Sequence, residues 1–382
     1  MLIKIRPLDT LFFRDGKPFT MGEESWANTI FPPPPTVIYG ALRSCYFASH
    51  ISELSKAAEE NDPTKNLKIN GIYFADEEND YFPLPRDCVQ IKDEKNKALL
   101  LKLEKMAGIA SSCPTKYVLQ APKLKDNEQV EAIQDGLIKL TALKDYLKGK
   151  KESFSIKPER KKEGKEQAFS ILKLKDKVLL EPKVGIGLNR KTGTADDKQG
   201  KLYHISMNRL KDFCLLVDFE GLKLDKVGLM KLGGEGKAVS YQKEEKVTIN
   251  SDKLKLEDQY FKLYLSTPAI FENGWFPSWL DQKTLQGTYN NSQSKEKKIE
   301  LELLTAAIGK YKTLGGFDMK LKRPKPMYRV VPAGSVYYFK VLNEDTAQRA
   351  FDLLNNKAIS DVYAEQGFGL AHIGRIHEDV NG

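Results

Sequence analysis

The stretch SVYYFKV at Ser335–Val341, followed by TAQRAFDLLN at Thr346–Asn355 and GLAHIGRI at Gly369–Ile376, decides the fold class. The first and third segments are short and rich in apolar, β-branched or aromatic residues, which predicts strands. The middle segment, Thr346–Asn355, is predicted to be a helix. The order strand–helix–strand indicates an α+β arrangement of the ferredoxin-like type.

The same order of strand, helix and strand is predicted earlier in the chain. The pattern predicts a strand at Phe213–Phe219, a helix at Leu224–Lys231 and a strand at Ala238–Gln242. Near the N-terminus, Leu2–Arg6 and Lys68–Ala75 alternate in character along the chain, which predicts two further strands. Strands and helices therefore alternate in both halves of the sequence.

A helix is expected between the two N-terminal strands. The prolines at Pro32–Pro35 cannot continue a helix, but Thr36 can cap one, so the helix is predicted at Val37–Ser49. A second helical segment is predicted from Ile51 to a stop at Asn61–Pro63.

Two ferredoxin-like (RRM-like) domains with large insertions are the simplest architecture for this pattern. The first domain is predicted at residues 1–210, with a helical and charged insertion and a β-hairpin at about 183–207. The second is predicted at 211–382, with an insertion at about 243–334 and a glycine-rich C-terminal loop. A chain of 382 residues is long enough for two such domains.

The insertion of the first domain has two parts. Val130–Lys148 has apolar residues at helical spacing, which predicts a helix. Lys148–Lys165 has eight basic and three acidic residues and few large apolar ones, so we expect a mobile surface loop there rather than a binding element.

The charge balance favours a polyanionic partner. Lys and Arg number 61 against 52 for Asp and Glu, which gives a net charge of +9. A lysine-rich surface without a specific partner is the alternative explanation.

Several classes of protein are disfavoured. The four cysteines are scattered and only four histidines occur, so we predict no metal or other cofactor and no disulfides, which fits a reducing compartment. The N-terminus lacks a signal-peptide pattern and no long apolar run exists. We therefore expect a cytoplasmic protein.

A donor-rich hairpin is predicted in the middle of the chain. Val184–Ala195 and Leu202–Ser206 are extended segments on either side of a polar turn. The hairpin carries donors suited to phosphates and base edges, unless it is an ordinary exposed hairpin. These candidate RNA-binding residues are Asn189, Arg190, Lys191, Thr192 and Thr194.

Two glycine-rich loops could also bind an anion. Leu232–Lys237 could place backbone N–H groups around one at Gly234, with Lys237 beside it, although a helix C-cap and a turn would explain the loop equally well. Gly367, Gly369 and Gly374 would allow a ligand to approach the backbone closely, unless they serve a turn or bulge before the last strand.

No catalytic set is evident. His50 follows the predicted first helix and His372 lies in the C-terminal glycine loop, but neither has a partner that the sequence identifies. General acid–base cleavage of RNA would need a positioned histidine, tyrosine or lysine. The sequence therefore favours a binding protein over an enzyme.

These features together resemble the RAMP superfamily of CRISPR-associated proteins, and within it the type III-B (Cmr) subunit family that caps the 5′ handle of the CRISPR RNA. The resemblance spans the chain in order. The matching stretches are Pro7–Gly16, Pro35–Arg43, Gly187–Ala195, Leu232–Gly236 and Gly367–Gly374. On this basis Arg14, Lys17 and Arg43 join the candidate RNA-binding residues.

The resemblance implies two ferredoxin-like folds and no known catalytic activity. It implies binding to the CRISPR RNA, to the large polymerase-like subunit and to the backbone RAMP subunit. The terminal glycine loop would contact RNA, and the central hairpin would be a thumb that holds the RNA near the junction of handle and guide. Asn189 departs from the Asp expected more often at that position.

Three alternatives are open. The chain could be the type III-A counterpart, which shares much of the pattern. It could be a RAMP endoribonuclease that processes CRISPR RNA precursors, with His50 as general base. It could also be an interaction scaffold without RNA contact.

Overall fold

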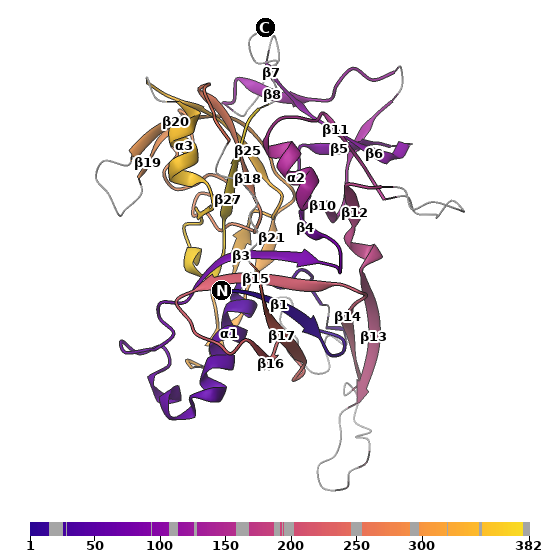
Figure 1. The fold of residues 1–382 in the computed structure, drawn as a ribbon, viewed down its shortest axis with the longest axis vertical. Coiled ribbons are helices and arrows are strands. Elements are labelled where there is room, and N and C mark those ends of the chain that lie inside the picture. The colour runs from indigo at the N-terminus through magenta and orange to yellow at the C-terminus, as the bar shows by residue number, and fades with distance from the viewer. Residues whose placement is uncertain are drawn as a thin grey trace. The chain divides into compact units, whose positions relative to one another are not determined.

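The computed structural model describes most of the 382 residues, and structural statements here concern that part alone. The described residues are 1–14, 26–27, 29–92, 94–106, 114–125, 128–157, 168–186, 192, 194, 202–245, 254–290, 298–318, 320–343 and 346–376. Strands greatly outnumber helices, which confirms the predicted α+β class (Figure 1). None of the described helices is long and apolar enough to cross a membrane.

The chain forms two compact units, each built from three separate segments. Unit 1 comprises Met1–Ile69, Lys175–Glu245 and Lys312–Arg329. Unit 2 comprises Asn70–Leu174, Lys246–Tyr311 and Val330–Gly382. Each unit combines segments from both sides of residue 210. The two consecutive domains expected from the sequence, which divide at residue 210, stay a prediction.

Unit 1 contains one α-helix and a set of mostly antiparallel strands. Its elements are β1 (Leu2–Pro7), β2 (Trp26–Ala27), α1 (Pro35–Ser49), the 3₁₀ helix η1 (Ile51–Lys56), β13 (Val178–Ile186), β14 (Leu202–Leu210), β15 (Cys214–Glu220), β16 (Val227–Lys231), β17 (Ala238–Glu244), β21 (Lys312–Leu314), β22 (Phe317–Asp318) and β23 (Arg323–Pro324). The elements at the unit boundaries are β3 (Lys68–Ala75), η2 (Leu174–Asp176) and β24 (Tyr328–Val330).

The core of unit 1 lies between α1 and four antiparallel strands in the order β15, β1, β17 and β16. Alternation along β1 buries Ile3 and Ile5, and Ile5 is in register with the buried Tyr241 of β17. On the helix, Cys45 lies 3.8 Å from the Tyr241 hydroxyl. The predicted strand at Leu2–Arg6 and the predicted helix at Val37–Ser49 are thus confirmed.

Three local predictions in unit 1 need correction. Thr36 does not cap α1: the helix begins at Pro35, after an extended Pro34, because proline at the first helical position has no N–H to satisfy. The second helical segment is a short 3₁₀ helix, η1. The helix predicted at Leu224–Lys231 is wrong, because β16 pairs with β17 there.

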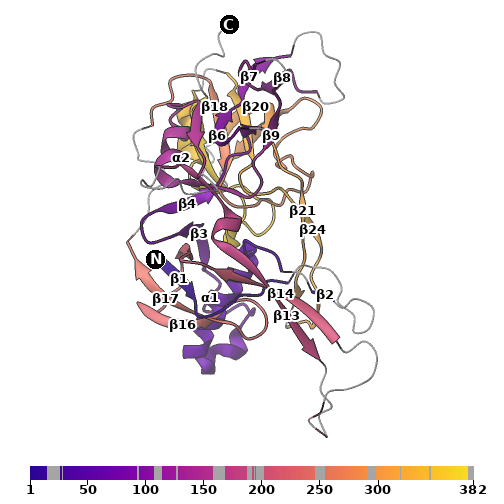
Figure 2. The same ribbon diagram turned by 90° about the vertical axis from the view of Figure 1, so that its right-hand side faces the viewer.

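The predicted hairpin is confirmed and begins earlier than expected. β13 and β14 pair in antiparallel register from Val178↔Leu210 to Ile186↔Leu202 (Figure 2). A small buried cluster of Phe12, Ala27, Ile205 and Met207 anchors β14 to the rest of the unit. Most of the turn between the strands lies outside the described residues.

Unit 2 contains two α-helices and several small sheets. Its elements are β4 (Asp80–Pro83), β5 (Cys88–Ile91), β6 (Glu94–Leu100), β7 (Lys102–Lys105), β8 (Tyr117–Gln120), β9 (Val130–Ala132), β10 (Gly136–Lys139), α2 (Leu140–Leu147), β11 (Ser153–Ser155), β12 (Ile171–Lys173), β18 (Tyr260–Leu265), β19 (Gln286–Asn290), β20 (Lys298–Ala307), β25 (Val336–Val341), α3 (Ala347–Leu354), β26 (Lys357–Ala358), the 3₁₀ helix η3 (Ala364–Gln366) and β27 (Leu370–Gly374).

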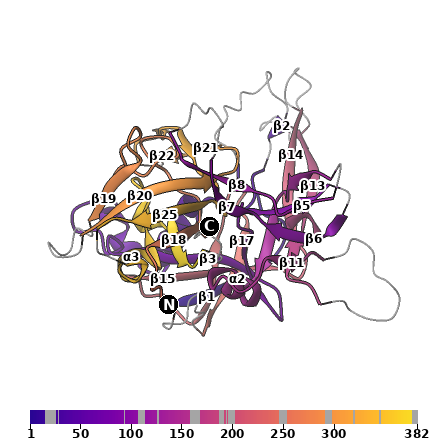
Figure 3. The same ribbon diagram turned by 90° about the horizontal axis from the view of Figure 1, so that it is seen from above.

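The largest sheet of unit 2 has the order β19-β20-β25-β18-β27-β26. Figure 3 labels its first four strands, β19, β20, β25 and β18. Its core includes Phe261 and Leu263 of β18 and Tyr337 and Phe339 of β25, with α3 packed against β25 and β27. The strand, helix and strand predicted at Ser335–Ile376 are confirmed as β25, α3 and β27.

The insertion predictions were partly wrong. The helix expected at Val130–Lys148 exists only at Leu140–Leu147, and β9 and β10 precede it. The reason is strand pairing: β10 pairs in antiparallel register with both β4 and β12, so its residues join a sheet instead of the helix. In the charged stretch, Ser153–Ser155 is a strand that pairs with β6, and residues 158–167 lie outside the described residues.

Candidate nucleic-acid interface

Three cations of unit 1 converge on Asp9, which follows β1. Lys237 Nζ lies 3.0 Å from Asp9 Oδ2, and Arg209 Nη2 lies 3.1 Å from Asp9 Oδ1. Lys183 Nζ lies 3.8 Å from Asp9 Oδ2 and donates a hydrogen bond to Thr10 Oγ1 at 3.2 Å. Lys183 and Arg209 come from the two strands of the hairpin, so the cluster lies at the hairpin base.

The backbone fixes Asp9 between the hairpin and β17. Leu8 N–H donates to Ala238 O, and Leu11 exchanges two hydrogen bonds with Asn208 of β14. This segment can therefore present the Asp9 carboxylate to both neighbours without moving.

The Asp9 cluster, defined as Asp9, Glu181, Lys183, Arg209 and Lys237, keeps a positive excess. Glu181 accepts hydrogen bonds from both Nε and Nη2 of Arg209. Three cations thus face two carboxylates, and the Lys183 and Arg209 side chains are each 42% exposed. Exposed cations at the base of a projecting hairpin are suited to binding phosphates.

The charges of the cluster are fixed by its own contacts. The hydrogen bond from Lys237 holds the pKa of Asp9 well below its ordinary value. The hydrogen bonds with Arg209 lower the pKa of Glu181, and those with Glu181 raise the pKa of Arg209. All three groups therefore stay ionised around neutral pH.

The loop Leu232–Lys237 positions Lys237 by packing on Phe12. Gly233 has φ +82°, and a Cβ there would lie 2.4 Å from Phe12 O. Gly234 N–H donates to the same oxygen at 2.8 Å. The N–H of Gly234 is thus used within the protein, and the loop follows strand β16, so the alternative of a helix C-cap is wrong.

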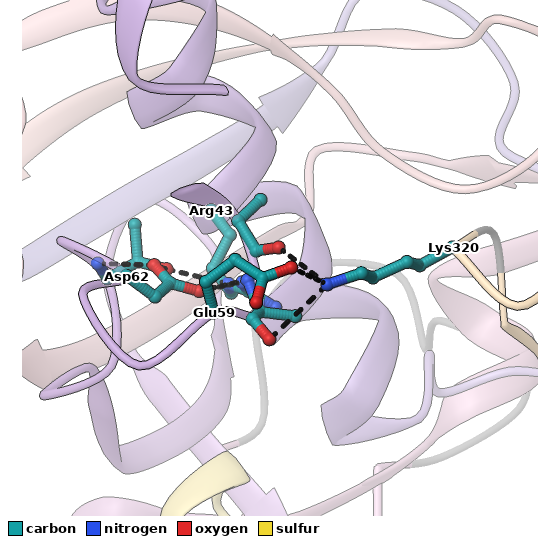
Figure 4. A network of polar contacts seen from close by, with 7 residues as sticks. Arg43, Glu59, Asp62 and Lys320 are labelled. Carbon is teal, nitrogen blue, oxygen red and sulfur yellow. Dashed lines mark hydrogen bonds and ion pairs between the residues drawn. The ribbon is translucent and has the colours of Figure 1, made fainter. Parts of the chain in front are cut away.

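Arg43 has an internal role in unit 1. Its Nη2 lies 2.5 Å from Asp62 Oδ2 and its Nε donates to Thr64 Oγ1 at 2.7 Å, which ties α1 to the turn that follows η1 (Figure 4). Lys320 contacts Glu59 and the carbonyls of Ala57 and Ala58 in the same network. Arg43 therefore has a structural explanation beside the predicted RNA contact.

The remaining hairpin and loop candidates are only partly described. Arg14 is exposed, and its backbone forms an isolated antiparallel β-bridge with Thr29. Thr192 and Thr194 are exposed, with their hydroxyls 2.7 Å apart. Lys17, Asn189, Arg190 and Lys191 lie outside the described residues.

The C-terminal glycines belong to unit 2 and are buried. Gly367 and Gly369 have φ +93° and +70°, and their N–H groups donate to Ala364 O and Pro268 O. A Cβ on Gly374 would lie 2.9 Å from Leu147 O. All three glycines therefore have a packing or turn role, and their predicted RNA contact stays a prediction.

The two histidines named as possible catalytic groups differ in their surroundings. His50 at the end of α1 stacks on Tyr46 at 4.2 Å, and its Nδ1 lies 2.9 Å from Tyr46 O. His372 is buried between Asn356 Oδ1 at 2.8 Å and Ser266 Oγ at 2.9 Å. Burial lowers the pKa of His372 to about 3, so it stays neutral at physiological pH.

His372 should make stability depend on pH. Between pH 6.5 and about 3 the unfolded chain binds a proton that the folded His372 excludes, so the free energy of unfolding should fall as pH falls. From pH 6.5 to about 5 the loss should be at most about 2 kcal/mol. Urea unfolding of wild type and His372→Gln at both pH values checks this, and an equal loss in both proteins would contradict it.

Sequence reasoning found Lys237 but missed Asp9, Lys183 and Arg209. On the hairpin a signal existed: Glu181 and Lys183 share one strand face, and Arg209 is opposite Leu179 on that face. For Asp9 there was none, because it lies 228 residues from Lys237 along the chain. Within the described residues, no group of three or more His, Cys, Asp or Glu side chains is placed to hold a metal ion.

Comparison with known proteins gives one family and several similar folds. The sequence model of the family described as CRISPR-associated protein (Cas_Cmr3) matches residues 3–376. The fold is similar to that of a chain in a cryo-EM structure of the Type III-B Cmr-beta bound to cognate target RNA and AMPPnP. The TM-score is 0.52 at 15% identity, over 99% of this chain and 100% of that chain.

Two other solved structures are less similar. A chain of the Type III-B Cmr-beta bound to cognate target RNA has a TM-score of 0.49 at 15% identity, over 97% of this chain and 96% of that chain. A chain of the Csm3-Csm4 subcomplex of the type III-A CRISPR-Cas interference complex has a TM-score of 0.37 at 11% identity, over 90% and 92%. No curated protein matches the sequence.

Proposed function

Because the chain belongs to the Cas_Cmr3 family of CRISPR-associated proteins and is thus a subunit of a type III-B (Cmr) effector, we propose that it binds the 5′ handle of the CRISPR RNA. In this role it bridges the large polymerase-like subunit and the backbone RAMP subunit, and it does not cut RNA. The observation that carries the proposal is the Asp9 cluster, which gathers three cations at the base of the hairpin.

The chemistry of the cluster fits this role. Single-stranded RNA is held by basic grooves and by contacts from loops and hairpins. Arg209 offers a planar guanidinium that can bind a phosphate with two parallel hydrogen bonds, and Lys183 and Lys237 add positive charge beside it. The guide must be held without sequence preference, and phosphate contacts meet that requirement.

We also propose that the large sheet of unit 2 is a reduced ferredoxin-like fold. β25 and β27 both run antiparallel to β18, which lies between them, and α3 connects them. This is the split strand–helix–strand arrangement of that fold. Between β18 and β20 the described residues contain no helix.

Removing two cations of the Asp9 cluster should weaken RNA binding and its dependence on salt. Each neutralised phosphate contributes about −0.7 to the slope of log affinity against log salt for a single strand. We expect the magnitude of the slope to fall by about 1.4 in Lys183→Ala/Arg209→Ala. Fluorescence anisotropy with a handle-bearing RNA, at several salt concentrations, measures both quantities.

The matched control removes two lysines from another part of unit 1. Lys56→Ala/Lys65→Ala loses the same charge near η1 and should keep the wild-type slope. Equal slopes for the two double variants would contradict the placement of RNA at the hairpin base. A flat salt response of the wild type would contradict RNA binding itself.

Absence of cleavage is tested separately. The purified protein, incubated with repeat RNA without metal, should leave the RNA intact. A specific cut that disappears in His50→Ala would instead support the endoribonuclease alternative.

A further inference from the structure

Arg86 lies in the turn between β4 and β5 of unit 2, and its side chain is half-buried. Its Nε atom is buried without a hydrogen-bond acceptor, and the guanidinium forms no ion pair within the described part of the chain. An Nε–H group withdrawn from water without an acceptor costs free energy. Such a group is rare in a folded protein and calls for an explanation, and a bound anion would supply one.

The turn holds Arg86 in place from both sides. Arg86 N–H donates to Gly334 O at 2.8 Å. The next residue, Asp87, is buried and accepts hydrogen bonds from the hydroxyls of Tyr146 at 2.7 Å and Tyr338 at 2.6 Å. Because Asp87 is fixed in the core, the position of Arg86 does not depend on a bound anion.

The neighbours of Arg86 favour a nucleic acid. A Cβ on Gly309 would lie 3.1 Å from Cζ and Nε of Arg86, so the backbone after β20 lies directly against the guanidinium. Lys310 follows and is exposed, and the Tyr311 side chain is 53% exposed. Cations together with an exposed aromatic ring are typical of single-strand binding.

One carboxylate influences Arg86 without pairing with it. Burial lowers the pKa of Arg86, and the charge of Asp135 opposes this effect. No ion pair joins the two residues in the described structure, so the guanidinium keeps its capacity for a ligand.

We propose that Arg86, with Gly309 and Lys310 beside it, binds a phosphate of single-stranded RNA in unit 2, in addition to the Asp9 cluster of unit 1. The inference rests on the proposed RNA-binding function. It adds a second site whose cation forms no ion pair with another described residue, whereas the cations of the Asp9 cluster have carboxylate partners.

The test compares Arg86→Ala with Lys357→Ala, which removes an exposed cation from β26 in the same unit. We expect Arg86→Ala to bind a labelled single-stranded RNA about tenfold more weakly, with a salt slope smaller by about 0.7. Its thermal midpoint without RNA should stay equal or rise, because a buried Nε–H group without an acceptor is removed. Lys357→Ala should match the wild type in all three measurements.

Arg86→Lys provides a second measurement if the alanine variant does not fold. It keeps the charge but loses the planar donor set, so its RNA affinity should lie between those of wild type and Arg86→Ala. Wild-type affinity in a folded Arg86→Ala or Arg86→Lys would overturn the inference while leaving the proposed function intact. Unchanged RNA affinity with lost assembly into the Cmr complex would assign Arg86 to a protein carboxylate instead. A wild type that binds no RNA would overturn both proposals.

Discussion

Replacing Asp87 with alanine should lower the free energy of unfolding by about 3–5 kcal/mol at neutral pH. Asp87 is fully buried and accepts the hydroxyl hydrogens of Tyr146 and Tyr338. The equally buried Lys262 has its Nζ 3.4 Å from the centre of the Tyr146 ring. Burial lowers the pKa of Lys262 to about 8 and the charge of Asp87 opposes this effect. Without Asp87, the hydroxyls of Tyr146 and Tyr338 lose their hydrogen-bond acceptor, and the ammonium group of Lys262 loses a nearby negative charge.

Urea denaturation at neutral pH measures this loss. The double variant Asp87→Ala/Lys262→Met should recover part of it, because no unpaired charge is left in the core. Tyr338→Phe, which removes a single donor, should cost less than Asp87→Ala. A loss below about 1 kcal/mol for Asp87→Ala would show that the buried carboxylate is not what holds Lys262 in the core.

Gly369→Ala should be the second most damaging change, at about 2 kcal/mol or more. Gly369 has φ +70°, and a Cβ there would lie 2.5 Å from Ser360 N and 2.9 Å from Ser360 Cβ. Its own N–H is bonded to Pro268 O. The substitution therefore strains the backbone and forces the chain at Ser360 to move. Thermal unfolding of the free protein measures the effect.

Gly40→Ala is the matched control. Gly40 lies within α1 and has no atom near its missing Cβ, so alanine should stabilise the protein by about 0.5–1 kcal/mol. RNA affinity measured on the folded Gly369→Ala protein separates two roles of the loop. The predicted RNA-contacting loop requires a loss of affinity in the folded variant, whereas wild-type affinity would leave the loop a packing role alone.

The sequence predicted best the elements whose pattern and packing agree. Leu2–Arg6 and Lys68–Ala75 alternate and form strands, and the proline-led segment forms α1. The helices predicted at Leu224–Lys231 and over the first half of Val130–Lys148 are wrong, although the apolar residues of the second segment fit helical spacing. Pairing with other strands outweighed the helical spacing. Such pairing joins residues that are distant along the chain, so the periodicity of a short segment cannot predict it.

The candidate site shows the same limit. Lys237 could be predicted because glycines precede it, and the hairpin because its two extended arms surround a polar turn. Asp9 and Arg209 lie 200 residues apart along the chain. No sequence pattern indicates Arg86 as a binding residue. Its surroundings depend on Gly309 and Gly334, which lie far from it along the chain.

The three-segment composition of each unit has a consequence for how the protein is made. Translation delivers Met1–Ile69 first, yet the last segment of the same unit, Lys312–Arg329, emerges only after most of the chain has left the ribosome. Neither unit can be completed while the other is still unsynthesised. A fragment ending before residue 312 would leave both units short of a segment, so premature termination should yield products for proteolysis rather than a stable half-protein.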